Sequence, residues 1–197
     1  MSEFMPNILA KFLAQHRDVT VELRERLSYL VVKAVAEGNA DLGIVAGQSV
    51  AHDIEFLPYH RDRLVLVTDL NHPLAELAEV SFVETLQYEY VGLSEWSAIH
   101  AFLIQAADNL GVNFRFRVEV GSFDSVCRMI EAGVGVGVVP ERVANRYGQN
   151  MNIKSIRLTD NWAERQLYIC VRALKDLPHF ARALVEMMQQ ESRQPNT

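Results

Sequence analysis

The chain has 197 residues, of which 49% are hydrophobic, with a formal net charge of -6 and a pI of about 5.5. This length accommodates one large domain or two small ones. The acidic balance and the scattered arginines argue against direct nucleic-acid binding by this chain. No apolar run is long enough to span a bilayer, and the acidic start lacks the basic region of a signal peptide. We therefore expect a cytoplasmic protein without membrane contact.

The first part of the chain predicts a helix followed by a β-α-β unit. Apolar residues at helical spacing predict the helix over residues 6–15. A β-branched strand over residues 19–25, a helix over residues 29–37 and an apolar strand over residues 42–46 follow, with Gly38 ending the helix. Such a unit requires parallel strands and a right-handed crossover.

The middle of the chain continues with strands and short helices. We predict separate strands over residues 54–59 and 63–68, and a third over residues 88–93. Ser81 and Glu84 have the spacing of a capping box and predict a short helix. A polar turn after the third strand leads into an amphipathic helix over residues 99–110.

A second β-α-β unit is predicted further along the chain. It consists of a strand over residues 114–120, a helix that begins at Ser122 and ends at Gly133, and a strand over residues 136–140. Two such units about a hundred residues apart predict two α/β lobes. The chain closes with a helix over residues 141–147, strands over residues 153–158 and 166–172, and a helix over residues 178–190.

Glycines at positions 133, 135 and 137 resemble a nucleotide-binding loop only superficially. A dinucleotide fingerprint follows a strand and opens a helix. These glycines follow a predicted helix and open a predicted strand. They predict a helix end followed by close backbone packing.

The sequence offers no catalytic residues, no metal site and no cofactor site. The histidines lack metal-binding spacing, and no Gly-x-Ser-x-Gly motif is present. The two cysteines, Cys127 and Cys170, are not in a Cys-x-x-Cys motif and are expected to be buried, inert thiols. Ser97 and His100 have the spacing of a helix N-cap followed by a surface histidine. We therefore expect no enzymatic activity.

Three serines indicate a binding site. Ser28, Ser97 and Ser122 each stand at the predicted start of a helix, just past a strand. Helix N-termini carry free N–H groups and a partial positive charge, so they bind carboxylates and other small anions. Each serine could instead serve only as an N-cap. For three serines at equivalent places, we favour a shared ligand site at the carboxyl ends of the strands.

Three stretches together resemble the effector-binding domain of LysR-type transcriptional regulators. They are residues 37–44 with the sequence EGNADLGI, residues 62–67 with DRLVLV followed by NHPL at 71–74, and residues 129–140 with MIEAGVGVGVVP. The resemblance runs from about Pro6 to Gln190. It implies an α/β fold like that of type 2 periplasmic binding proteins, with two Rossmann-like lobes joined by two crossing strands. Regulatory lobe I would comprise residues 1–67 and 168–197, and regulatory lobe II residues 68–167.

The resemblance also implies a ligand and a set of ligand-binding residues. The effector would be a small, often anionic metabolite held between the lobes. The positions that match the effector site are Ser28, Ser94, Glu95, Trp96, Ser97, Ser122, Phe123 and Asp124. Asp124 departs from a simple anion site, because its carboxylate repels an anion unless it faces away or meets a cationic part of the effector.

The resemblance further implies partners. Sensor domains of this family pair as antiparallel homodimers through the first helix and the helix over residues 99–110, and the full-length protein would be a tetramer. DNA would bind only through an N-terminal winged helix-turn-helix absent from this chain. The first strand of lobe I would also precede residue 1. The alternatives are a solute-binding protein of a transport system, which needs an export signal, and an enzyme on the same fold, which needs a catalytic group.

Overall fold

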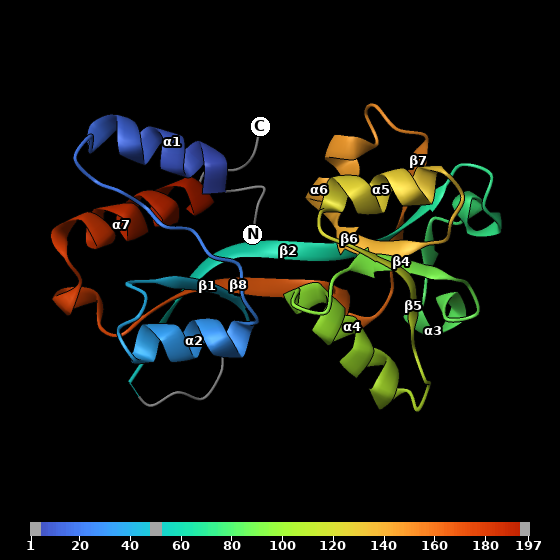
Figure 1. The fold of residues 1–197 in the computed structure, drawn as a ribbon, viewed down its shortest axis with the longest axis horizontal. Coiled ribbons are helices and arrows are strands. Elements are labelled where there is room, and N and C mark those ends of the chain that lie inside the picture. The colour runs from blue at the N-terminus through green and yellow to red at the C-terminus, as the bar shows by residue number, and fades with distance from the viewer. Residues whose placement is uncertain (1–4, 48–52, 194–197) are drawn as a thin grey trace. The chain divides into compact units, whose positions relative to one another are not determined.

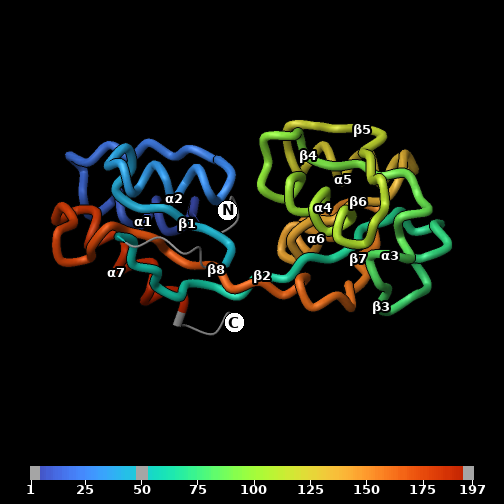
Figure 2. The backbone as a smooth tube through the Cα atoms, turned by 90° about the horizontal axis from the view of Figure 1, so that it is seen from below, coloured from blue at the N-terminus to red at the C-terminus, as the bar shows by residue number. Residues whose placement is uncertain are grey.

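The computed structural model describes residues 5–47 and 53–193 and contains two compact α/β units. Unit 1 comprises residues 1–61 and 166–197, and unit 2 comprises residues 62–165. The chain passes from one unit to the other twice, within β2 (Glu55–Asp69) and within β8 (Glu164–Val171). These two strands are neighbours in one sheet and can be followed in Figures 1 and 2.

Unit 1 has helices on both faces of a sheet in the order β1-β8-β2. Helices α1 (Met5–Gln15) and α7 (His179–Arg193) cover one face, and α2 (Ser28–Ala36) covers the other (Figure 1). Strand β1 (Gly43–Ala46) pairs antiparallel with β8. A short 3-10 turn, η3 (Leu174–Asp176), precedes α7.

The alternation of side chains along β1 and β8 explains why both faces are covered. Ile44 and Ile169 lie in one apolar cluster with residues of α1 and α7. Val45 and Cys170, the next residues along each strand, lie in another cluster with Val32 of α2. Since successive side chains of a strand point to opposite faces, each face needs its own helical layer.

Unit 2 is built around a mixed sheet with more strands than the sheet of unit 1. Its strands are β3 (Glu79–Val80), β4 (Tyr90–Leu93), β5 (Phe116–Val120), β6 (Gly137–Pro140) and β7 (Ile153–Leu158), together with part of β2. Strand β2 pairs antiparallel with both β6 and β7, and β3 pairs parallel with β7. Strands β4 and β5 are parallel, and a parallel bridge between Tyr90 and Val136 joins β4 to the β6 side.

Helices cover both faces of the unit 2 sheet. One apolar cluster joins α3 (Phe82–Thr85) and α4 (Ala98–Asn109) to inward residues such as Leu64 and Leu66. The other joins α5 (Phe123–Glu131) and α6 (Glu141–Tyr147) to Val65 and Val67. Alternate residues of β2 thus supply both cores. The 3-10 turns η1 (Pro73–Glu76) and η2 (Asn161–Ala163) contribute Leu74 and Ala163 to the first of these clusters.

The predicted second β-α-β unit is present as β5-α5-β6. Strand β4 lies between β5 and β6, so the crossover passes over one intervening strand. Gly133 ends α5 with a φ of 74°, a conformation that glycine adopts without a steric penalty. A side chain at Gly135 would place its Cβ 2.3 Å from the carbonyl oxygen of Glu89. The predicted helix end and close backbone packing are therefore confirmed.

The predicted strand over residues 19–25 is wrong. These residues form no ladder with any strand in the described part of the chain. Val19 and Val21 pack against the unit 1 core, whereas Leu23 is exposed. The apolar alternation therefore reflects an extended segment lying on a core, without the hydrogen-bonded partner that a strand requires. The predicted first β-α-β unit consequently lacks its first strand.

The length of one strand and the limits of the two units also differ from the prediction. The strands predicted over residues 54–59 and 63–68 form the single 15-residue strand β2. The compact units meet at residues 61/62 and 165/166, whereas the division based on resemblance placed these boundaries at 67/68 and 167/168. The regulatory roles of these lobes stay a prediction.

No helix among the described residues is long and apolar enough to cross a membrane. Both cysteines are buried, as predicted. Burial raises the pKa of the Cys127 thiol to about 11, with a further contribution from the nearby Asp124 charge. Burial also raises the pKa of the Cys170 thiol to about 11.

Candidate functional site

Helix N-termini gather at one edge of the unit 2 sheet. Strands β5, β4 and β6 run parallel, so their carboxyl ends meet at that edge. Helix α6 begins directly after β6, whereas α5 and α4 begin after short turns over residues 121–122 and 94–97. The backbone N–H of Ser94 donates to the carbonyl of Val120 at 3.0 Å, which ties the end of β4 to the end of β5. The starts of α4 and α5 therefore lie next to each other.

Ser97 is the N-cap of α4. Its Oγ accepts a hydrogen bond from the backbone N–H of His100 at 3.1 Å, and Ser97 is buried. The N–H of Ser97 donates to the carbonyl of Ser94 at 2.9 Å, which closes the turn. Within this turn Glu95 is exposed, and Trp96 is 76% exposed. A tryptophan this accessible is unusual for a residue that contributes only to packing.

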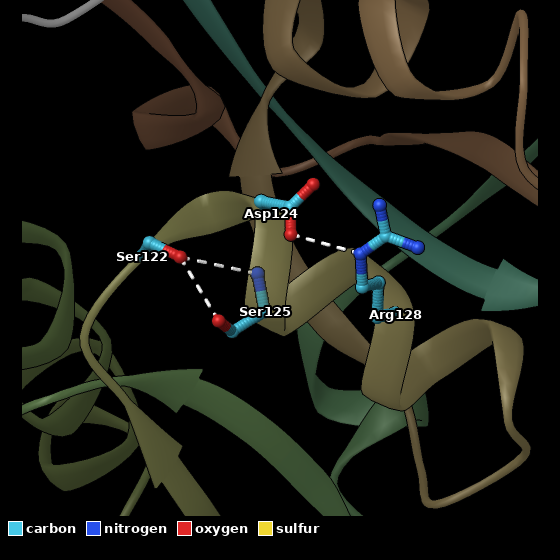
Figure 3. A network of polar contacts seen from close by, with 4 residues as sticks. All are labelled: Ser122, Asp124, Ser125 and Arg128. Carbon is cyan, nitrogen blue, oxygen red and sulfur yellow. Dashed lines mark hydrogen bonds and ion pairs between the residues drawn. The ribbon is translucent and has the colours of Figure 1, made fainter.

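Ser122 is the N-cap of α5 and is exposed. Its Oγ accepts from the backbone N–H of Ser125 at 3.2 Å and lies 3.0 Å from the Oγ of Ser125 (Figure 3). Two hydroxyl groups therefore stand together at the start of this helix. Phe123, the first residue of α5, is half-buried against the cluster that includes Val126.

The charge of Asp124 is paired. Its Oδ2 accepts a hydrogen bond from the Nε of Arg128 at 2.9 Å, one helical turn away (Figure 3). This hydrogen bond, followed by the Coulombic attraction of Asp124, raises the pKa of Arg128. Asp124 also lies in the first turn of α5, where a negative charge is favourable. The repulsion expected between Asp124 and an anion is therefore partly offset by Arg128.

Ser28 lies in unit 1, at the first residue of α2. The N-cap of this helix is Leu27, which makes no side-chain capping bond. The capping alternative thus applies to Ser97 and Ser122 and is wrong for Ser28. The other seven predicted site residues belong to unit 2. Their participation with Ser28 in one ligand site stays a prediction.

The structure adds residues that sequence reasoning did not include. His100, predicted to be a surface histidine, has a side chain only 13% exposed; it stacks on Phe116 and has its Nε2 3.6 Å from a carboxylate oxygen of Glu119. Ser125 and Arg128 join the Ser122–Asp124 segment. Ser125 lies three residues after Ser122, and Arg128 lies four residues after Asp124. Residues at these spacings share one face of a helix, so the sequence could have identified both.

The chemistry available at this edge is binding of an anion or a hydroxylated ligand. The N–H groups at the starts of α4 and α5 and the Ser122 and Ser125 hydroxyls are suitable partners for a carboxylate or phosphate. Among the residues that the structure describes, no group of three or more His, Cys, Asp or Glu side chains could hold a metal ion.

Comparison with known proteins gives a consistent set of matches. Residues 1–193 match the family model described as the LysR substrate binding domain. An HTH-type transcriptional regulator of Methanocaldococcus jannaschii is 29% identical over 84% of the chain. The chain spans 56% of the length of that relative, so the relative includes a large part with no counterpart here.

Solved structures with low sequence identity share the fold. The regulatory domain of CcmR from Synechocystis PCC6803, in complex with 2-PG, is 18% identical with a TM-score of 0.81, over 96% of this chain and 91% of that one. The effector binding domain of QuiR in complex with shikimate is also 18% identical, with a TM-score of 0.73, over 98% and 91% of the two chains.

Proposed function

Because the chain belongs to the LysR substrate binding domain family, we propose that it is the effector-sensing part of a LysR-type transcriptional regulator. Its α/β fold is of the type 2 periplasmic-binding-protein-like kind. Two α/β units connected by two crossing strands are suited to a ligand that binds to both units and so changes their arrangement. Binding of a small molecule would then control DNA binding by a winged helix-turn-helix outside this chain.

The proposed ligand site contains Ser94, Glu95, Trp96, Ser97, Ser122, Phe123 and Asp124 in unit 2, and Ser28 in unit 1. The observation that carries it is the Ser94–Val120 hydrogen bond, which brings the starts of α4 and α5 to one edge. Ser122 and the exposed Trp96 provide a hydroxyl group and an apolar surface at that edge.

The proposed effector is a small anionic metabolite. Helix N-termini favour negative charge, and the carboxylate of Asp124 in the first turn of α5 is paired with Arg128. Shikimate, the ligand in the QuiR complex, is a carboxylate with hydroxyl groups, which is the chemistry that serine hydroxyls and free N–H groups recognise. The protein would act in the cytoplasm, bind without converting its ligand, and assemble through paired sensor domains.

A thermal-shift screen of carboxylate and phosphate metabolites, including shikimate, tests this function. An effector present at a hundredfold excess over Kd should raise the free energy of unfolding by roughly 2.7 kcal/mol. Ser122→Ala should weaken binding about 10-fold, because it removes a hydrogen-bonding group from the site. Ser81→Ala is the matched control, since Ser81 caps α3 through its own capping box.

If wild type, Ser122→Ala and Ser81→Ala bind the effector with equal affinity, the start of α5 is not part of the site. If no compound in a broad anion panel stabilises the protein, the proposed ligand class is wrong. If a bound compound is converted by the purified protein, at a rate that follows the protein through gel filtration, the non-enzymatic assignment is wrong.

A further inference from the structure

A largely buried ion pair lies where the chain crosses between the units. The crossings fall between Arg61 and Asp62 in β2, and between Arg165 and Gln166 in β8. Asp62 is therefore the first residue of unit 2, on β2, and Arg165 is its last residue, on β8. The Nη2 of Arg165 donates to the Oδ2 of Asp62, and their side chains are only 14% and 7% exposed. The ion pair links the two crossing strands at the boundary of unit 2.

The next residue of β8 makes a different connection. The side-chain Nε2 of Gln166 donates to the backbone carbonyl of His60 at 3.1 Å and to that of Leu167 at 2.9 Å. All three of these residues belong to unit 1. Consecutive residues of β8 thus connect the two crossing strands on the two sides of the boundary, first through charge and then through an uncharged amide.

Static stability alone is a poor explanation for the Asp62–Arg165 pair. A buried ion pair recovers its desolvation cost only when its other hydrogen-bonding groups are also satisfied. The Nε of Arg165 is buried and has no hydrogen-bond partner among the described residues. Such a pair contributes little net stability compared with apolar side chains, but its fixed geometry specifies how two strands lie together.

The pair also lies toward the sheet edge that holds the unit 2 part of the candidate site. Strand β2 enters the unit 2 sheet with Leu64 opposite Pro140, the last residue of β6. Helix α6 begins directly after Pro140, at the same edge as the starts of α4 and α5. The crossing strands therefore enter unit 2 at the edge where the proposed ligand would bind.

We propose that Asp62 and Arg165 form a hinge clasp that makes the two crossing strands move as one at the boundary of unit 2. Rotation between the units then occurs at residues 60–61 and 166, on the unit 1 side of the clasp. With the clasp intact, the two connections cannot twist independently. This inference rests on the proposed ligand-controlled arrangement of the units, and the clasp itself can be tested without any ligand.

A neighbouring ion pair on the same strands provides a matched control. Arg63 of β2 pairs with Glu164 of β8, one residue along from the clasp on each strand. The side chains of Arg63 and Glu164 are 28% and 60% exposed, and Glu164 lies 3.8 Å from Arg157 as well. An exposed pair that is screened by solvent should fix strand geometry less strongly.

The experiment measures a distance distribution between spin labels, one in each unit. Cysteines replacing the exposed residues Glu37 and Asp108 carry the labels, while the native thiols are buried. Asp62→Asn should broaden the distribution by roughly 1.5-fold and accelerate amide exchange near residues 62–64 by about 10-fold. The double variant Asp62→Arg with Arg165→Asp should restore the wild-type width and exchange rate. Glu164→Gln should change neither the width nor the exchange rate.

Arg165→Lys provides a second test if Asp62→Asn does not fold, because it keeps the charge and loses the planar guanidinium geometry. The clasp is disproved if folded Asp62→Asn or Arg165→Lys retains the wild-type width, or if Glu164→Gln broadens the distribution equally. A failed metabolite screen with a broadened Asp62→Asn distribution would reject the ligand proposal and leave the hinge clasp intact.

Discussion

At the scale of single residues, the serines differ in ways that sequence alone does not reveal. Ser97 and Ser122 both accept a backbone N–H three residues ahead, whereas Ser28 lies one position inside its helix and caps nothing. An N-cap needs an extended backbone at the capping residue, and in α2 Leu27 has that conformation. A shift of one residue therefore separates a capping serine from one whose hydroxyl is not used for capping.

Ser122→Ala should lower the free energy of unfolding by about 1 kcal/mol, because the start of α5 loses its cap. Ser28→Ala should change it by less than about 0.5 kcal/mol, since no capping bond is lost. Urea denaturation with a shared m-value measures both. An equal loss in the two variants would mean that Ser28 stabilises α2 by another route.

The thiols of Cys127 and Cys170 should not react with a disulfide reagent at pH 8 while the protein is folded. Burial raises the pKa of each to about 11, from a reference value of 9.0, so the folded state favours the neutral thiol. Because the folded state holds the thiols neutral, they add to the free energy of unfolding. This contribution is fully present below pH 9 and is lost as pH rises toward 11. Absorbance assays with and without urea give the reactivity. Fast reaction of the folded protein would contradict the assignment of inert thiols.

At the scale of elements, local patterns predicted helices better than strand pairing. The capping box at Ser81 and Glu84 is present, and α6 has the predicted bounds. The segment over residues 19–25 has strand-like alternation but no partner in the described chain. Helices satisfy their hydrogen bonds locally, whereas a strand depends on a neighbour that the local sequence does not specify.

The apolar residues of α4 also show that a local pattern does not tell which surface a helix packs against. Leu103 is 1% exposed, and Ala106 also belongs to the unit 2 core, whereas Leu110 at the end of the stripe is exposed. The stripe therefore packs mainly on its own unit. A charge at Leu103 would disrupt that core, so dimerisation has to be tested by substituting an exposed residue.

At the scale of the whole molecule, we propose a homodimer in which α1 and α4 lie at the interface. Leu13 of α1 is 36% exposed, and Leu13→Glu should raise the dimer dissociation constant at least 10-fold, because a charge would be desolvated there. Met129→Glu on α5, at a residue 38% exposed, is the control and should leave it unchanged. Sedimentation equilibrium measures both. A wild-type monomer at tens of micromolar, or equal effects of the two substitutions, would reject this interface.

The sequence by itself determined most of the helices, the helix ends at Gly38 and Gly133, and the family. These depend on periodicity, turn chemistry and short motifs, all of which act within a few residues. Only the tertiary structure decided that β2 is one strand crossing both units and that Leu103 belongs to the unit 2 core. It also brought together Asp62 and Arg165, which are 103 residues apart. Burial and strand pairing depend on which distant residues become neighbours, and that is a property of the folded chain as a whole.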